Sequence, residues 1–275
     1  MATDQTRADW AARVQQYAEY SAHKNRPFAE HLVGLVAPRP GEQVLDVATG
    51  PGVAAVAAAR AIGNGDGVLA TDLVAEWEPY VAAAAREAGV ALAFRPMPGE
   101  ALDLPDASVD VVISQFGLML MPEPDRALRE IRRVLRPGGR LGVAVWSTGD
   151  RVGHFIPMRI MQSMLPPSDE PAPPGPLSLS APGLIERLVA EAGFEQVRSE
   201  RHTEAYAQED PEADWRRMTG EGGIMAGPAL ARLTGEQRAR MHDEVIAAYE
   251  SFRGEDGTIR IPSEAIFVTA RKPSA

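Results

Sequence analysis

Two acidic side chains and a pair of glycines stand where a charged small molecule could bind. Asp46 lies in an apolar run that turns at Gly50 and Gly52, and Asp72 ends the next apolar run. Glycine has no Cβ, so the chain can turn sharply there and a ligand can lie against bare peptide groups. The alanine-rich stretch 53–62 predicts a helix, whose N-terminus favours an anionic group. We therefore expect a small ligand at this turn.

The spacing by itself leaves two ligand classes open. Gly50, Gly52 and Ala55 satisfy the G-x-G-x-x-G/A pattern of dinucleotide-binding proteins, in which an acid about 20 residues on holds a ribose. Asp46 argues against a pyrophosphate, because like charges would then face each other in a poorly solvated turn. S-adenosylmethionine offers cationic groups to Asp46, a carboxylate to the helix and a ribose diol to Asp72. The residues therefore favour this sulfonium cofactor over NAD.

Several segments resemble the class I S-adenosylmethionine-dependent methyltransferases, in the branch of the ubiquinone and menaquinone methyltransferases with a methyltransferase type 11 domain. The segments that carry the resemblance are 44–52, 70–72, 104–112 and 127–140. In the last of them, apolar side chains at helical spacing precede Pro137-Gly138-Gly139, after which a new strand begins. The resemblance implies methyl transfer from S-adenosylmethionine to a small molecule, with S-adenosylhomocysteine as product.

The resemblance also implies a set of cofactor-binding residues. These are Asp46, Ala48, Thr49, Gly50, Gly52, Asp72, Leu73, Gly99, Glu100, Gln115 and Phe116. Asp46 is expected near the ammonium, Asp72 is expected to accept hydrogen bonds from the ribose hydroxyls, and Leu73 is expected to pack under the adenine. Ala48 stands where relatives usually carry their first glycine, and its methyl group still leaves the backbone approachable.

The expected adenine pocket departs from the family pattern. Relatives commonly show Gly-Asp-Ala-Glu, whose Asp accepts from the adenine amino group, whereas this chain has Met97-Pro98-Gly99-Glu100. Because Pro98 offers no carboxylate, three alternatives remain for holding the base. They are the backbone of Gly99 or Glu100, apolar contacts, and the Glu100 side chain.

Catalysis by such an enzyme needs no dedicated residue, because orienting two reactants in a dry pocket supplies roughly 7–11 kcal/mol. If the acceptor requires a general base, His154 is the expected one of the five histidines, because it follows the fifth strand in the first insertion. Tyr17, Tyr20 and Met119 are candidate substrate residues. No cluster of Asp, Glu and His has the spacing of metal ligands, so no metal is expected.

Hydrophobic periodicity predicts the elements that position these residues. Apolar runs predict seven strands, and helices alternate with the first five, which indicates an α/β fold with a Rossmann-like, doubly wound sheet. The strands are expected at 43–48, 67–72, 91–96, 109–115, 140–147, 194–202 and 265–271. In the family, the last strand is antiparallel to the others. Two further helices are expected ahead of the first strand, at 8–21 and 28–36.

Two stretches, 148–180 and 203–261, interrupt the alternation of helices and strands. They are expected to form helical cap insertions that exclude water from the reaction. A surface flap and a dimer contact are the alternatives. The expected organisation is an N-terminal helical cover at 1–38, a cofactor-binding core at 39–147, a Pro-rich insertion at 148–180, a core helix and strand at 181–202, a helical cap insertion at 203–261, and a final strand and tail at 262–275.

Composition narrows the range of partners. The 28 Lys+Arg and 38 Asp+Glu give a formal charge of -10, which disfavours nucleic acid as a partner. The arginines of 126–140 interleave with acids, so a solvated helix face is favoured over a basic patch. The chain has no cysteine, which excludes disulfides, zinc–thiolate sites and thiol nucleophiles. No apolar run matches a signal peptide or a membrane span, so we expect a cytoplasmic protein, with a homodimer left open.

The motifs, the resemblance and the composition leave three candidate functions. The first is methyl transfer to oxygen, nitrogen or carbon of a quinone-like or secondary-metabolite small molecule. The second is a protein that keeps S-adenosylmethionine as a structural element while it acts as a cyclase or a binding protein. The third is an NAD-dependent oxidoreductase, against which Asp46 and the segment 128–140 argue.

Overall fold

The computed structural model describes residues 2–63, 66–166, 174–208, 210–220, 225 and 228–274. The chain divides into two compact units. The first comprises Met1–Trp146, Pro173–His202 and Ala265–Ala275, and the second comprises Ser147–Ala172 and Thr203–Glu264. Part of the Pro-rich insertion, residues 167–173, lies outside the described residues. Within the described ranges, no helix is both long and apolar enough to cross a membrane.

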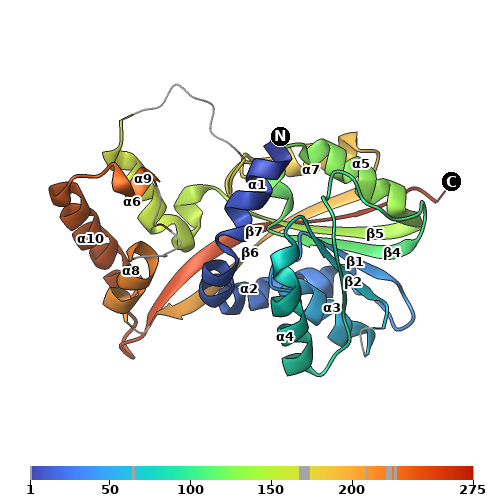
Figure 1. Cartoon of the computed structure of the whole chain (residues 1–275), viewed down its shortest axis with the longest axis horizontal. Coiled ribbons are helices and arrows are strands. Elements are labelled where there is room, and N and C mark those ends of the chain that lie inside the picture. The colour runs from blue at the N-terminus through green and yellow to red at the C-terminus, as the bar shows by residue number, and fades with distance from the viewer. Residues whose placement is uncertain are drawn as a thin grey trace. The chain divides into compact units, whose positions relative to one another are not determined.

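A seven-stranded sheet forms the frame of the first unit, with the order β3-β2-β1-β4-β5-β7-β6 (Figure 1). The strands are β1 (Val44–Val47), β2 (Val68–Asp72), β3 (Ala93–Pro96), β4 (Val109–Gln115), β5 (Leu135–Trp146), β6 (Glu195–Gln208) and β7 (Ile259–Arg271). Strands β1 to β5 pair in parallel, and β7 is antiparallel to β5. These findings confirm the predicted doubly wound sheet with an antiparallel last strand.

Helices cover both faces of this sheet. They are α1 (Ala2–Ala11), α2 (Val14–Val36), α3 (Val53–Ile62), α4 (Glu78–Ala88), α5 (Pro124–Val134) and α7 (Leu184–Glu191), with short 3-10 turns η1 (Ala75–Trp77) and η2 (Leu118–Leu120). Helices α2, α3 and α4 pack together on one face, and α5 packs with α7 on the other (Figure 1). Four buried alanines let α3 approach its neighbours closely. Its bounds are those predicted.

The predicted break between the two N-terminal helices was wrong. The break lies at Ala12 and Arg13, and α2 then continues through Pro27 to Val36. A proline inside a helix removes a hydrogen bond and costs about 3 kcal/mol. Burial on the C-terminal side of the proline offsets this cost, because Phe28 is 1% exposed and its neighbours along the same helix face are also buried.

Strands β6 and β7 extend farther than predicted, into the stretch assigned to the helical cap insertion. Strand β6 reaches Gln208 and β7 begins at Ile259. In the added part of β7, the side chains of Ile259, Ile261 and Ser263 are fully buried. The less exposed face of the added part of β6 carries Glu204, Tyr206 and Gln208, so its period-2 pattern gave no apolar signal.

The second unit has its own helices and its own hydrophobic core. It contains α6 (Ile156–Met164), α8 (Pro211–Thr219), α9 (Pro228–Ala231) and α10 (Gly235–Glu250), with 3-10 turns η3 (Gly149–Arg151) and η4 (Gly153–Phe155). Helix α10 begins with a capping box between Thr234 and Gln237. It packs against α6 and α8, and Met241, Val245 and Tyr249 of α10 are fully buried in the core. Helices α8 and α10 lie within 203–261, the stretch that was expected to be helical.

Candidate active site

The turn between β1 and α3 has three residues in the left-handed backbone region. Their φ angles are 58° for Ala48, 52° for Gly50 and 86° for Gly52. Glycine adopts such angles freely, whereas an alanine pays about 1–2 kcal/mol. A Cβ added at Gly117 would collide with the Cβ of Ala48. Gly117 therefore leaves the space that the Ala48 methyl group occupies.

Asp46 is fully buried in the middle of the sheet, opposite Ala70 of β2 and Ile113 of β4. Its Oδ2 accepts a hydrogen bond of 2.6 Å from the Thr49 hydroxyl. Burial raises the pKa of Asp46 to about 7, although the Thr49 and Ala55 hydrogen bonds act in the opposite direction. The carboxyl group thus holds the turn through Thr49 and lies behind it.

Asp72 joins the end of β2 to the glycine turn. Its Oδ2 accepts from the Gly50 amide at 2.9 Å, and its Oδ1 accepts from the Val74 amide at 3.0 Å. Burial raises the pKa of Asp72 to about 6, and the amide hydrogen bonds oppose that rise. A carboxylate offers about four acceptor positions, more than these amides use, so Asp72 is suited to accept from a ribose hydroxyl.

One cavity of the first unit brings most of the predicted cofactor residues together. Those that line it are Ala48, Thr49, Gly50, Asp72, Leu73, Gly99, Glu100, Gln115 and Phe116. Asp46 and Gly52 do not line it. Asp46 acts through Thr49, and Gly52 forms the N-cap of α3 next to Val81.

Aromatic side chains from the N-terminal helices form another part of the cavity wall. Trp10 and Tyr17 meet edge to face with ring centroids 5.7 Å apart, and Tyr17 meets Trp77 in the same way at 6.0 Å. The Tyr17 hydroxyl accepts from the Asn25 side chain at 3.4 Å. Burial raises the pKa of Tyr17, and the nearby Asp72 charge adds to that rise. Tyr17 lines the same cavity as Asp72, the residue expected to bind the ribose.

Sequence reasoning did not assign Trp10, Asn25 or Trp77 to the site, although all three line the cavity. The helical spacing of Trp10 and Tyr17 was the available signal, because a stripe on one helix face must pack against something. Asn25 also joins the helix to the sheet, since its carbonyl oxygen accepts from the Gln115 side chain at 2.8 Å. Trp77 gave no signal, because its place depends on the short η1 turn.

Phe116 and Gly117 follow β4 and line the cavity next to the glycine turn, where Gly117 lies against Ala48. Phe116 has a φ of 57°, which is strained for a bulky side chain. Its ring stacks on Trp146 with centroids 3.8 Å apart and meets Phe28 edge to face at 5.6 Å. This packing holds the strained backbone in place.

The adenine end of the expected site is formed by Met97, Gly99 and Glu100, whereas Pro98 does not line the cavity. A Cβ added at Gly99 would lie 2.7 Å from the Cε of Met121. The Met121 side chain thus takes the space that a side chain at position 99 would need. Among the described residues of 97–100, Glu100 is the only acidic residue that lines the cavity.

The remaining candidate residues lie elsewhere. Tyr20 is buried outside the cavity, with the Lys24 ammonium 3.6 Å from its ring centre. Met119 is 3% exposed, and its neighbours Leu120 and Met121 line the cavity instead.

His154 belongs to the second unit. Its Nδ1 lies 2.5 Å from the Ser263 hydroxyl, and its ring lies against Tyr206 with centroids 4.6 Å apart. Its backbone N–H donates to the same hydroxyl at 3.2 Å, so Ser263 orients both the ring and the backbone. The catalytic role of His154 stays a prediction.

The arginines of 126–140 carry carboxylate partners. The ion pairs are Arg126 with Glu123, Arg129 with Asp125, Arg133 with Asp106 and Glu130, Arg136 with Asp110, and Arg140 with Glu42. Arg132 donates instead to the Gly193 carbonyl. This pairing partly neutralises the cluster, which agrees with a helix face rather than a basic patch.

The cavity fits S-adenosylmethionine by the chemistry of its wall. Among the described residues that line it, only Asp72 and Glu100 are charged, and both are acids that suit a cationic ligand. The amides at the start of α3 are suited to a carboxylate. Leu73, Val74 and Met97 supply apolar contacts for a base. Within the described part of the chain, no group of three or more His, Cys, Asp or Glu could hold a metal.

Comparison with known proteins agrees with this geometry. Residues 45–143 match a family described as a methyltransferase domain. The nocamycin O-methyltransferase of Saccharothrix syringae is 31% identical over 185 residues, which cover 63% of this chain and 66% of the relative. The ubiquinone/menaquinone biosynthesis C-methyltransferase UbiE of Bordetella avium is 37% identical over 127 residues, covering 46% and 50%.

A similar fold is found in the crystal structure of the [4+2]-cyclase SpnF. The TM-score is 0.58 at 23% identity, with 91% of this chain and 81% of that chain covered. The chain spans about half the length of the first curated relatives it matches, for example 53% of a Mycobacterium tuberculosis protein that is 35% identical. Residues 45–143 are a methyltransferase domain, and in this segment the chain is similar to the class I S-adenosylmethionine-dependent methyltransferases.

Proposed function

We propose that the protein transfers the methyl group of S-adenosylmethionine to an oxygen, nitrogen or carbon atom of a quinone-like or secondary-metabolite small molecule. The observation that carries the proposal is the cavity in which the glycine turn, Asp72 and the aromatic wall meet. The cofactor would supply an electrophilic methyl group on its sulfonium.

The residues of the cavity divide the work of binding it. Asp72 accepts hydrogen bonds from the ribose hydroxyls, and the amides at the start of α3 hold the carboxylate. Trp10, Tyr17 and Trp77 exclude water from that side of the cavity. Orientation in a dry pocket then supplies most of the catalysis. His154 is the proposed base for acceptors that must lose a proton.

Calorimetric titration with S-adenosylhomocysteine and with NAD is the first test. The wild-type protein should bind S-adenosylhomocysteine, and Asp72→Asn should weaken this binding at least tenfold because an amide offers one acceptor oxygen in place of two. Glu76→Gln is a matched control, since Glu76 follows on the η1 turn and does not line the cavity. Binding of NAD without binding of S-adenosylhomocysteine would contradict the proposal.

A second candidate function is catalysis of a cyclisation with the cofactor kept unreacted, which the fold match to SpnF favours. An acceptor panel with methyl-labelled S-adenosylmethionine separates the two. Methyl transfer gives a product heavier by the labelled methyl group and one S-adenosylhomocysteine for each turnover. A cyclisation gives a product of unchanged mass and no S-adenosylhomocysteine.

A further inference from the structure

The loop between β3 and β4, residues 97–108, contains no helix and no strand. It nevertheless supplies Met97, Gly99 and Glu100 to the cavity. Irregular segments of this length are uncommon in compact domains, and ordering each residue costs about 1–2 kcal/mol. Specific contacts must therefore hold the loop in its shape.

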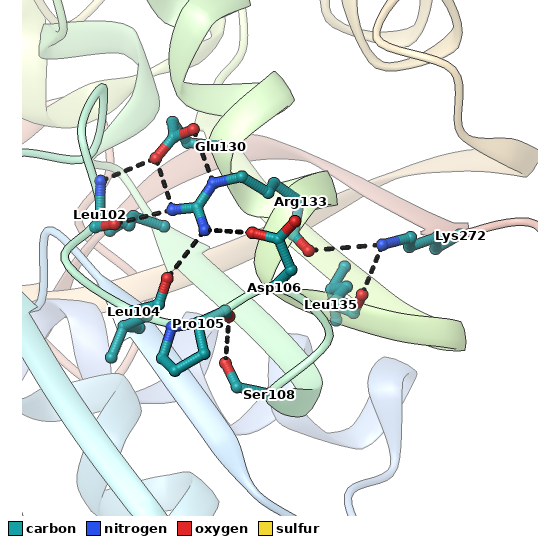
Figure 2. Close-up of polar contacts among 9 residues, drawn as sticks. All are labelled: Leu102, Leu104, Pro105, Asp106, Ser108, Glu130, Arg133, Leu135 and Lys272. Carbon is teal, nitrogen blue, oxygen red and sulfur yellow. Dashed lines mark hydrogen bonds and ion pairs between the residues drawn. The ribbon is translucent and has the colours of Figure 1, made fainter.

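Arg133 of α5 provides the densest set of these contacts (Figure 2). Its Nε and Nη2 donate to the two oxygens of Glu130 at 2.9 and 2.8 Å. Nη2 also donates to the Leu102 carbonyl at 2.7 Å, and Nη1 donates to the Leu104 carbonyl at 2.8 Å and to Asp106 at 2.7 Å. The guanidinium group thereby uses all of its N–H donors.

Glu130 completes this clamp, because its Oε2 accepts from the Leu102 amide at 3.0 Å (Figure 2). Both the backbone N–H and the carbonyl oxygen of Leu102 therefore form hydrogen bonds with side chains of α5. The hydrogen bond from Arg133 holds the pKa of Glu130 below its ordinary value, so Glu130 stays ionised near neutral pH. The helix itself is firmly placed, since Leu128 and Ile131 are fully buried.

The clamped residue lies close to the cavity along the chain. Leu102 is two positions after Glu100, and the Ala101 amide closes a turn onto the Pro98 carbonyl at 3.1 Å. The other end of this segment is also fixed, because the Met97 amide donates to the Asp72 carbonyl at 2.8 Å. The cavity-lining turn is thus held at both ends, on one side by β2 and on the other by Arg133.

We propose that Arg133 is a positioning residue for the nucleoside end of the cofactor cavity, acting through Leu102 on the turn that carries Gly99 and Glu100. The inference rests on the cofactor site proposed above. Arg133 has no direct part in binding, since it does not line the cavity. A lysine could not replace it, because a single ammonium group cannot donate to all four acceptor groups that the planar guanidinium group reaches.

The test compares Arg133→Gln with Arg129→Gln in the full chain. Arg129 lies on the same helix and pairs with Asp125 at 2.8 Å, but its side chain is 61% exposed and it does not contact the loop in any described interaction. We expect Arg133→Gln to weaken binding of S-adenosylhomocysteine about tenfold in calorimetry. Arg129→Gln should stay within twofold of wild type.

Two further readouts separate positioning from general destabilisation. Hydrogen exchange should quicken in the peptide 97–106 of Arg133→Gln and stay unchanged in β1 and α3. The wild-type preference for S-adenosylhomocysteine over its hypoxanthine analogue should also shrink in this variant, because a displaced turn reads the base less well. Equal loss of affinity for both compounds, or faster exchange throughout the sheet, would overturn the inference.

The outcome for wild type keeps the two proposals apart. If wild type fails to bind S-adenosylhomocysteine, the proposed function fails. If wild type binds it and Arg133→Gln binds it equally well, only the positioning role fails. Should Arg133→Gln not fold, Glu130→Gln tests the same clamp, since it weakens the contacts to Leu102 and Arg133 while it retains the shape of the side chain. Unchanged affinity and exchange in Glu130→Gln would then overturn the inference.

Discussion

Ala48 carries a strained backbone at the point where the family resemblance predicts a glycine, and its methyl group fits because residue 117 has no side chain. The two positions are complementary, since a Cβ at 117 would collide with the Ala48 Cβ. The φ of Gly117 is -94°, an angle that alanine adopts without strain. The exclusion of a side chain at 117 is therefore due to contact with Ala48 and not to its own backbone.

We expect Gly117→Ala to lower the free energy of unfolding by about 1–3 kcal/mol, the usual cost of overpacking. Adding Ala48→Gly should recover more than half of that loss. Urea unfolding of the two single variants and the double variant gives the coupling energy. Additive losses would show that the two side chains do not compete for one space.

Asp46 makes the stability of the protein depend on pH. Its folded pKa of about 7 lies above its ordinary value of 3.8, so the folded state binds the proton more tightly than the unfolded state does. The stabilising effect is complete below about pH 4 and is lost as the pH rises through about 7. The slope is at most about 1.4 kcal/mol per pH unit. We expect Asp46→Asn to flatten the curve of unfolding free energy against pH.

Asp72 contributes to the same dependence of stability on pH, but only up to about pH 6. Its pKa of about 6 should leave Asp46→Asn with a residual slope that ends near pH 6, whereas wild type continues to lose stability up to about pH 7. Urea unfolding at half-unit steps of pH resolves the two curves. Identical slopes above pH 6 in both proteins would remove Asp46 as the cause.

Residue types and spacing predicted the part of the site that follows from one local motif. The glycine turn, Asp72 and the end of β4 lie together because the carboxyl ends of adjacent parallel strands meet at one edge of the sheet. The place of Trp10 and Trp77 in the cavity wall could not be predicted from a local motif, because it depends on how the helices pack. Asp46 was expected near the ammonium; it does not line the cavity and accepts from the Thr49 hydroxyl, so its part in binding stays a prediction.

At the scale of elements, Arg140 of β5 links the end of α2 to Glu42 in the turn that precedes β1. Its Nε donates to the Val36 carbonyl at 2.8 Å, and its guanidinium forms hydrogen bonds of 3.1 and 2.6 Å with Glu42. A cation at the C-terminus of a helix also interacts favourably with the helix dipole. The pair is well shielded, with side-chain exposures of 16% and 21%.

We expect Arg140→Gln to lower the free energy of unfolding by about 1.5–3 kcal/mol, the usual worth of a charged hydrogen bond in such a setting. Arg126→Gln is the matched control, because Arg126 and Glu123 form an exposed pair that contributes at most about 1 kcal/mol. Thermal and urea unfolding measure both variants. An equal loss in the two would show that the link to α2 adds nothing.

Elements with regular periodicity were predictable, and those defined by their neighbours were not. Strand β4 and helix α3 have the predicted bounds, because apolar residues predominate in each. The expected end of helix α5 at Pro137 was wrong, since the helix stops at Val134 and Leu135 already pairs with Val109. The register shift that follows lets the strand pass its proline and glycines.

At the scale of the whole molecule, two separate hydrophobic cores predict that stability and cofactor binding can be changed independently. The described lining of the cofactor cavity belongs to the first unit, and Met241 is fully buried in the core of the second. We expect Met241→Ala to cost about 2–5 kcal/mol of unfolding free energy. Affinity for S-adenosylhomocysteine should change less than twofold.

Leu128→Ala gives the comparison in the first unit. Leu128 is also fully buried, so the cost of unfolding should be similar, but it lies on the helix that carries Arg133. Its affinity for S-adenosylhomocysteine should therefore fall. Calorimetry at a temperature where both variants remain folded provides the measurement. A loss of affinity in Met241→Ala as large as in Leu128→Ala would argue against independent units.

The place of β7 in the sheet has a consequence for how the chain is made. Strand β7 comes last in the chain, yet it lies between β5 and β6. During synthesis, β5 therefore remains an open edge and β6 has no partner until β7 emerges from the ribosome. An open edge next to a completed parallel sheet favours association with other chains. The nascent protein should thus depend most on chaperones in the interval just before β7 emerges.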